Sequence, residues 1–194
     1  MIREHVMSRH LSATNYRTMP WANGLGKTVE LIRRHTCEGK LLWRLSMATV
    51  NQDGPFSILT DVERNLTVLT GNGFDLIEDE SGVQHSAALL TPVAFSGSIP
   101  VTARNVAAPC KDFNVMTSRD LPKPQVWVEH QRSEPKIIKG PQLALFAISP
   151  STVNTVEGVF SLKSHELLLC QKSAVLQEGK LICVALGSAY IEQV

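Results

Sequence analysis

The chain has 194 residues, of which 43% are hydrophobic, and its 19 Lys and Arg residues nearly balance 18 Asp and Glu residues, giving a net charge of +1. This length and apolar content suffice for a buried core in one large or two small domains. A net charge this small provides no long-range field, so we expect no direct binding of nucleic acid and no association with a membrane.

The N-terminus and the cysteines predict a cytoplasmic protein. Residues 1–5 lack an apolar signal core, and the longest apolar run, residues 181–186, is far too short to span a bilayer. The four cysteines show no Cys-x-x-Cys spacing, which favours reduced thiols. The six histidines form no His-x-His or His-x-x-x-His pair, so we expect no metal and no other cofactor.

Residues 16–30 form the least generic stretch of the chain. Its distinctive members are Trp21, Asn23, Gly24, Gly26, Thr28 and Glu30. Gly26-Lys27-Thr28 matches the end of a phosphate-binding loop, but the first glycine of that motif falls on Trp21 and no buried strand precedes it. The stretch therefore predicts a bent loop that leads into a strand, with a simple glycine turn before an edge strand as the alternative.

The segment 41–50 predicts a strand with two different faces. Trp43 and Leu45 alternate with Arg44 and Ser46, so one face belongs to a core. On the other face, Arg44 either meets solvent or lines a polar cavity. A second alternating segment, 113–117, places Asn114 and Met116 on one side, and an amide inside a barrel needs a hydrogen-bond partner.

Short extended segments between Gly and Pro turns continue along the chain. Segments 64–70 and 74–78 flank Gly71-Asn72-Gly73, which predicts a hairpin. Further strands are expected at residues 29–34, 56–59, 83–85, 88–91, 93–95, 99–106, 125–130, 136–139, 142–148, 156–160, 165–170, 174–176, 181–186 and 189–192. No amphipathic helix of normal length is expected. Strands at this spacing predict an all-β barrel or double-sheet jelly roll.

A proline-rich break marks the best internal boundary. Leu121-Pro122-Lys123-Pro124 cannot continue a central strand. We therefore expect an N-terminal domain over residues 1–120, which carries the pocket, and a second β-rich half over residues 121–194, closely packed on the first.

Five sequence blocks in a fixed order resemble the HutD/Ves family. They are Trp21-x-Asn23-Gly24-x-Gly26-x-Thr28-x-Glu30, Trp43-Arg44-Leu45-Ser46, Asp53-Gly54-Pro55-Phe56-Ser57, Val62-Glu63-Arg64-Asn65-Leu66-Thr67-Val68-Leu69-Thr70-Gly71 and Phe113-Asn114-Val115-Met116. The resemblance covers about the first 120 residues. Leu25 stands where many relatives carry a glycine, and Thr70 stands where an acidic residue is common. The resemblance implies a cupin-like (RmlC-like jelly-roll) fold with two β-barrel halves and a link to histidine utilisation.

The resemblance and the residue types together predict a ligand site in the mouth of the first barrel. Its candidate residues are Trp21, Asn23, Gly24, Thr28, Glu30, Arg44, Ser46, Arg64, Asn114 and Met116. The expected ligand is a small anionic metabolite such as urocanate or a formylated or formiminated glutamate. Arg44 would pair with its carboxylate and Trp21 would cover a planar face.

Several of these residues have a purely structural alternative. Arg64 is either a second cation near the site or a member of a surface ion pair. Trp21 is alternatively a core plug and Thr28 a plain strand residue. Glu30 either accepts a ligand N–H or orients Arg44.

Three functions from different classes follow from this site. The leading hypothesis is a regulatory binding protein without catalytic residues, with a homodimer or a pathway protein as a further partner. The second is a metal-independent cupin enzyme in which Glu30 acts as acid or base. The third is a protein-interaction module whose pocket is only scaffolding.

Overall fold

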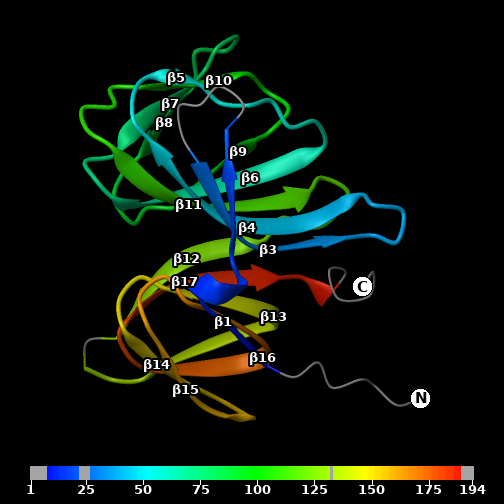
Figure 1. The fold of residues 1–194 in the computed structure, drawn as a ribbon, viewed down its shortest axis with the longest axis vertical. Helices are drawn as coiled ribbons and strands as arrows, with labels where there is room; N and C mark the ends of the chain where they lie inside the picture. Colours follow the sequence, from blue (N-terminus) through cyan, green and yellow to red (C-terminus); the bar gives the residue numbers. More distant parts are fainter. Residues whose placement is uncertain (1–7, 22–26, 132, 189–194) are drawn as a thin grey trace. The chain divides into compact units, whose positions relative to one another are not determined.

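The computed structural model describes residues 8–21, 27–131 and 133–188, which divide into two compact units. The central unit is the continuous stretch Tyr16–Lys123, and the terminal unit joins the residues up to Asn15 to those from Pro124 onward. Both units are built from strands (Figure 1). Helical structure among the described residues is limited to 3-10 geometry, in η1 (Ala13–Asn15) and at Ser188. The all-β expectation is therefore confirmed for this part of the chain.

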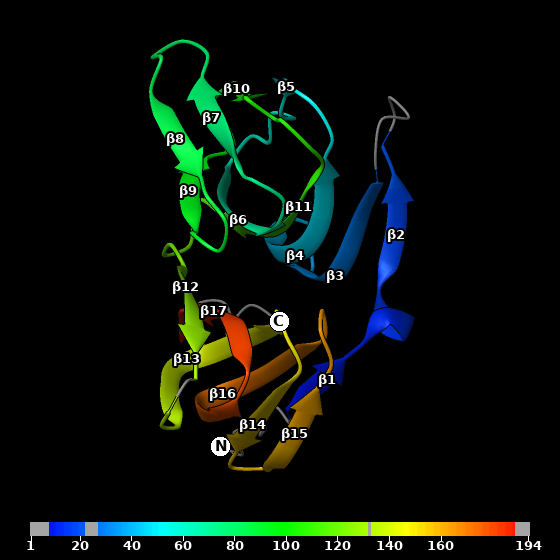
Figure 2. The same cartoon turned by 90° about the vertical axis from the view of Figure 1, so that its left-hand side faces the viewer.

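The central unit contains two antiparallel sheets. The larger has the order β2-β3-β4-β11-β6-β9, and Figure 2 shows β2, β3 and β4 side by side along it. Its strands are β2 (Arg17–Pro20), β3 (Lys27–His35), β4 (Leu41–Val50), β6 (Val62–Thr70), β9 (Val93–Ser96) and β11 (Cys110–Ser118). The smaller sheet has the order β5-β10-β7-β8, with β5 (Gly54–Pro55), β7 (Phe74–Glu78), β8 (Gln84–Ala87) and β10 (Val101–Arg104).

One apolar cluster joins these two sheets. It takes Val50, Leu66 and Phe95 from the larger sheet and Leu76 and Val101 from the smaller one, all buried. Burial of side chains from two facing sheets is the arrangement of a double-sheet β-fold, and it agrees with the jelly-roll expectation.

The strand β4 follows the predicted alternation. Trp43 and Leu45 are fully buried on one face, while Arg44 and Ser46 lie on the other. On that second face Ser46 is opposite Asn114 and Arg44 is opposite Met116 of β11. The pairing therefore brings the polar residues of two predicted strands onto one surface.

The predicted hairpin of segments 64–70 and 74–78 is wrong. Both strands exist, but β6 pairs with β11 and β9 in the larger sheet, while β7 pairs with β10 and β8 in the smaller. Gly71 and Gly73 have φ values of 98° and 80°. A Cβ on Gly71 would meet the carbonyl oxygen of Pro109 at 2.9 Å, and one on Gly73 that of Ala87 at 2.5 Å. The glycines thus allow a close crossing between sheets and do not form a two-residue turn.

Two other predicted strands of the central unit are not formed. Residues 56–59 follow the two-residue strand β5, and residues 88–91 contain only an isolated bridge at Leu89. Pro55 cannot donate a ladder hydrogen bond, and β5 accordingly pairs with β10 alone, at the edge of the sheet.

The terminal unit is one antiparallel sheet with the order β12-β17-β13-β16-β14-β15, and β1 adds to β16. Its strands are β1 (Arg9–Leu11), β12 (Gln125–His130), β13 (Lys136–Ala147), β14 (Ser151–Thr155), β15 (Gly158–Leu162), β16 (Leu167–Glu178) and β17 (Lys180–Leu186). Strand β14 was not predicted, and residues 156–157, expected to be extended, form the turn between β14 and β15. The strand expected at 189–192 lies outside the described residues.

Two pairs of predicted strands are continuous in the structure. Segments 136–139 and 142–148 belong to β13 except for Ile148, and segments 165–170 and 174–176 belong largely to β16. The β13–β16 register shifts between Gly140 and Gln142, so a bulge lets the strand pass the Gly140-Pro141 pair.

The N-terminal residues differ from the predicted domain division. In place of a first domain over residues 1–120, β1 pairs with β16, with Leu11 buried opposite Leu167. The unit boundary near Lys123 falls within the proline-rich break. The N-terminal strand therefore belongs to the same unit as the C-terminal half of the chain.

A polar cavity as the candidate functional site

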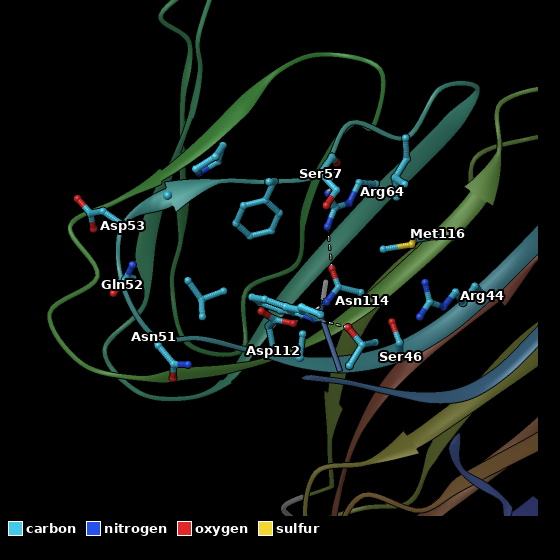
Figure 3. A pocket seen from close by; sticks show the side chains of 18 residues that line it. Arg44, Ser46, Asn51, Gln52, Asp53, Ser57, Arg64, Asp112, Asn114 and Met116 are labelled. Carbon is cyan, nitrogen blue, oxygen red and sulfur yellow. Dashed lines mark hydrogen bonds between the residues drawn. The ribbon is translucent and has the colours of Figure 1, made fainter. Parts of the chain in front are cut away.

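A cavity of about 700 Å³ opens in the central unit. Side chains from β3, β4, β6 and β11 line it together with the segment 51–59, and Figure 3 shows the labelled ones around the space. Seven of the ten predicted site residues are in the lining: Trp21, Thr28, Arg44, Ser46, Arg64, Asn114 and Met116. Glu30 is not in the lining, and Asn23 and Gly24 lie outside the described residues.

Strand pairing explains how residues distant in sequence meet at this cavity. Met116 of β11 is opposite Arg44 of β4 on one side and Arg64 of β6 on the other. Adjacent strands lie about 4.8 Å apart, so the backbones at the two arginines are about 10 Å apart across the methionine. Both guanidinium groups thus belong to one wall of the cavity.

Arg64 is the buried cation of the site. Its residue is only 7% exposed, and its guanidinium carbon lies 5.0 Å from the ring centre of Phe56 and 4.9 Å from that of Phe95. Burial lowers the pKa of Arg64 to about 10, which still leaves it charged at neutral pH. The alternative of a surface ion pair is therefore wrong.

The hydrogen bonds of Arg64 leave much of its donor capacity open. Its Nη1 and Nη2 donate to the Ser57 carbonyl and to Oδ1 of Asn114, each over 3.4 Å, while its buried Nε has no hydrogen-bond partner. Both distances exceed the usual range for N–H···O bonds, so these contacts are weak. A charged donor group held this way is suited to an incoming acceptor.

Asp112 is a buried carboxyl group in the cavity wall. It is 1% exposed, and its Oδ1 accepts a hydrogen bond from Nδ2 of Asn114. Desolvation by burial raises the pKa of Asp112 to about 7, partly opposed by the positive charge of Arg64. In Figure 3, Asn114 lies between Arg64 and Asp112, and the dashed lines mark the hydrogen bonds that link the three.

Glu30 holds arginines in place. Its Oε2 lies 2.8 Å from Nε of Arg44, and its Oε1 lies 3.4 Å from Nε of Arg33. The Glu30 side chain is only 8% exposed, so its charge holds the half-buried Arg44 nearby as an ion pair, without a hydrogen bond of normal geometry between the two atoms. Of the two roles left open by the sequence, the structure shows the one that orients Arg44.

Trp21 and Thr28 form a pair at the cavity. The indole Nε1 donates to the Thr28 hydroxyl over 2.9 Å, and Trp21 is half-buried. Trp21 is thus not a core plug, and Thr28, besides belonging to β3, fixes the orientation of the indole.

Sequence reasoning missed two important members of the wall. Asp112 precedes Asn114 by two residues in β11 and so shares its face, which strand alternation alone indicates. Phe56, which packs against Arg64, lies in a sequence block that also carried the family resemblance. Strand alternation and the shared sequence block are therefore the signals that indicate these two residues.

Comparison with known proteins establishes the family. The sequence profile of HutD matches residues 13–184. The chain belongs to the HutD family. It is also 39% identical over 110 residues to an uncharacterised 21.2 kDa protein from the hutC 3′ region of Pseudomonas putida, a match that covers 55% of this chain and 56% of that relative.

Solved structures agree with this HutD assignment. A conserved protein of unknown function from Pseudomonas aeruginosa PAO1 has a TM-score of 0.82 at 25% identity, over 94% of this chain and 100% of that one. HutD from Pseudomonas fluorescens SBW25 has a TM-score of 0.78 at 25% identity, over 93% and 98%.

A more distant structure extends the likeness to cupins in fold alone. A cupin 2 conserved barrel domain protein from Leptotrichia buccalis has a TM-score of 0.51 at 6% identity, over 96% of this chain and 92% of that one. The predicted cupin-like fold is therefore confirmed.

Two kinds of feature are absent from the described residues of this HutD-family chain. These residues contain no group of three or more His, Cys, Asp or Glu arranged to hold a metal ion. They also contain no helix with the length and apolar character needed to cross a bilayer.

Proposed function

We propose that this HutD-family protein is a cytoplasmic, small-molecule-binding regulator of histidine utilisation, and that its cavity takes a small anionic intermediate of the pathway. Urocanate and formyl- or formimino-glutamate are the candidate ligands. The observation that carries the proposal is Arg64, a buried cation in the cavity wall that forms no ion pair with a carboxylate among the described residues.

Burial makes an anionic ligand the natural partner of Arg64. A desolvated charge is costly unless it is paired and hydrogen-bonded. A ligand carboxylate accepts two parallel N–H bonds from a guanidinium, and Arg64 has under-used donors for this purpose. The gain on binding is therefore larger than for an exposed arginine.

Arg64 is better suited to this role than Arg44, which the sequence favoured. Arg44 already has a carboxylate partner, since Glu30 lies 2.8 Å from its Nε. We assign Arg64 as the primary carboxylate anchor and Arg44 as a second cation, with Met116 between them. Two cations in one wall also suit a ligand with two acidic groups.

The rest of the wall suits a small body with polar atoms. Trp21 and Phe56 offer aromatic surface, while Ser46 and Asn114 offer hydroxyl and amide groups. Such a mixture of apolar surface with a few convergent polar groups is typical of metabolite sites. The genomic position of the Pseudomonas putida relative, beside hutC, supports the choice of histidine-derived ligands.

Catalysis by Glu30 receives less support from the geometry. A general acid or base must come within hydrogen-bond reach of a substrate proton. Glu30 is outside the cavity lining and is engaged by Arg33 and Arg44. Product formation from either ligand class, abolished in Glu30→Gln with binding retained, would favour the enzyme over the binding protein.

Isothermal titration calorimetry with urocanate and N-formyl-L-glutamate tests the proposal. We expect binding of at least one, and a loss of affinity of at least tenfold in Arg64→Gln. Arg104→Gln is the matched control, because Arg104 is exposed in the same unit and lies outside the cavity. Absence of binding at millimolar concentration, or equal affinity of Arg64→Gln and the control, would sink the assignment.

A regulatory role makes a further prediction about partners. Ligand-dependent co-purification with a pathway protein, or a ligand-dependent change between monomer and homodimer, is expected when the cavity is filled. If a ligand binds but changes neither the co-purification nor the oligomeric state, the protein binds the ligand and does not regulate through these partners.

A further inference from the structure

Asp112 places an unsatisfied carboxyl oxygen in the cavity wall. Its Oδ1 accepts from Asn114 and the backbone N–H of Ala48 also acts on the carboxyl, but the buried Oδ2 has no hydrogen bond of normal geometry. The residue is 1% exposed and belongs to the lining of the cavity. A buried carboxylate oxygen without a partner is costly, whereas a protonated one is a hydrogen-bond donor.

The charges around Asp112 come from four elements. Strand β6 contributes Arg64 and β4 contributes Arg44, which is tied to Glu30 of β3. The segment after β4 contributes Asp53, whose Oδ1 accepts the backbone N–H of Val106. Among the described residues, the cation that acts on Asp112 is Arg64.

A bound carboxylate would compete with Asp112 for this cation. In the free protein the positive charge of Arg64 favours the ionised form of Asp112. When a ligand carboxylate pairs with Arg64, it cancels this effect and adds a second negative charge to the same water-poor wall. Two carboxylates that share one cation in a buried site do not both stay ionised, because like charges favour protonation of one of them.

We propose that Asp112 is a second ligand-contacting residue and enters the complex as a neutral carboxylic acid, so that an anionic ligand and one proton bind together. The proton comes from solvent and resides on Oδ2, which donates a hydrogen bond to an acceptor oxygen of the ligand. The class of ligand is thus a carboxylate with a further acceptor oxygen, as in N-formyl-L-glutamate and unlike urocanate. This inference rests on the proposed function of the cavity.

The pH dependence of affinity follows from this arrangement. The pKa of Asp112 in the free protein is about 7, and the ligand raises it further. Below pH 7 the group already carries its proton, so affinity is constant. Above pH 7 each complex must take up a proton, and the Kd rises by up to about tenfold per pH unit. No histidine is among the described residues lining the cavity, so imidazole titration does not contribute there.

Calorimetry at pH 8 in two buffers with different ionisation enthalpies measures the proton directly. N-formyl-L-glutamate is the first probe, because carboxylates titrate well below pH 7 and its own protonation is constant in this range. Urocanate and acetate are the second and third. We expect uptake of close to one proton per ligand bound to the wild-type protein, and a tenfold or greater rise of Kd from pH 7 to pH 8.5.

Asp112→Asn separates the proton from the contact. Its amide keeps a neutral donor at the position of Oδ2, so binding persists at pH 8.5 while proton uptake and the pH dependence vanish. Asp79→Asn is the control, since Asp79 is exposed in the same unit and outside the cavity. Thermal unfolding of each variant at the same pH verifies that it is folded.

Each result decides between the two proposals. Arg64-dependent binding with no proton uptake overturns the role of Asp112 and leaves the function of the cavity intact. Proton uptake that persists in Asp112→Asn also overturns it. Failure of all three carboxylates to bind at pH 6.5 overturns both.

Discussion

The interiors of the two units are built from different chemistry. The core cluster of the terminal unit consists of apolar residues and two cysteines, among them Leu145, Cys170, Leu176 and Cys183. The larger sheet of the central unit instead buries charged and polar residues, including Arg64, Asp112 and Asn114, around a cavity. Burying such groups costs free energy that a filled apolar core does not lose. The central unit therefore gives up stability for buried polar groups, which agrees with the proposed binding role.

The largest expected loss of stability is in the apolar core of the terminal unit. Leu145→Ala removes a fully buried side chain from the terminal unit and should lower the free energy of unfolding by about 2–5 kcal/mol. Ile137→Ala, at a residue 66% exposed in the same strand, should change it by less than about 0.5 kcal/mol. Urea denaturation of both variants measures this. Equal losses in the two variants would mean that the core of the terminal unit is not tightly packed.

Asp112→Asn should raise the free energy of unfolding of the central unit in a pH-dependent way. The folded pKa of about 7 lies above the ordinary value of 3.8, so the folded chain holds a proton that the unfolded chain releases. The stability of the wild-type protein therefore falls as pH rises from about 4 to about 7 and then levels off. The variant lacks this loss and should exceed the wild type by roughly 2–4 kcal/mol at pH 8 and by little at pH 4. Denaturation at both pH values provides the measurement, and a constant difference would contradict it.

Gly71→Ala tests the crossing that makes the central unit a two-sheet structure. The new Cβ would fall 2.9 Å from the Pro109 carbonyl oxygen and 2.6 Å from Sγ of Cys110 at a φ of 98°. We expect the free energy of unfolding to fall by about 1–3 kcal/mol, measured by urea denaturation. Gly82→Ala also has a positive φ but meets nothing within 4 Å, so it isolates the cost of the backbone conformation. A loss no larger than that of Gly82→Ala would show that the crossing has room to adjust.

The smallest effect is expected at the edge of the cavity. Thr28→Val keeps the shape of the β3 side chain and removes the acceptor of the Trp21 indole N–H. A loss of about 0.5–1.5 kcal/mol of ligand affinity follows if Trp21 covers the ligand. Calorimetry gives the affinity and thermal unfolding gives the stability. Unchanged affinity would place Trp21 outside the ligand contact.

The sequence predicted much of the fold because alternation is a local property. The segment 41–50 has the same bounds in the structure, and its two faces separate as expected. Sheet membership is not local, which is why Gly71-Asn72-Gly73 suggested a hairpin where the chain crosses between sheets. Likewise β14, rich in Ser, Thr and Asn, has little apolar signal and owes its place to the strands beside it.

The candidate site was predictable in its residue types and less so in its roles. The pattern located Arg44, Ser46, Arg64, Asn114 and Met116, all of which line the cavity. Burial and pairing decide which arginine lacks a carboxylate partner, and both depend on tertiary structure. Alternation places Asp112 on the same face as Asn114, but the sequence reveals neither the burial of this aspartate nor its missing hydrogen bond.

The pairing of β1 with β16 has a consequence for synthesis of the chain. Arg9–Leu11 leaves the ribosome early, but its partners, Leu167 to Leu169, are made more than 150 residues later. The central unit is continuous and has all its strands available before then. We therefore expect the half that carries the cavity to fold during translation, while the N-terminal strand waits for the end of the chain. A nascent chain long enough for Lys123 to have left the ribosomal tunnel should already have the central unit protected from protease.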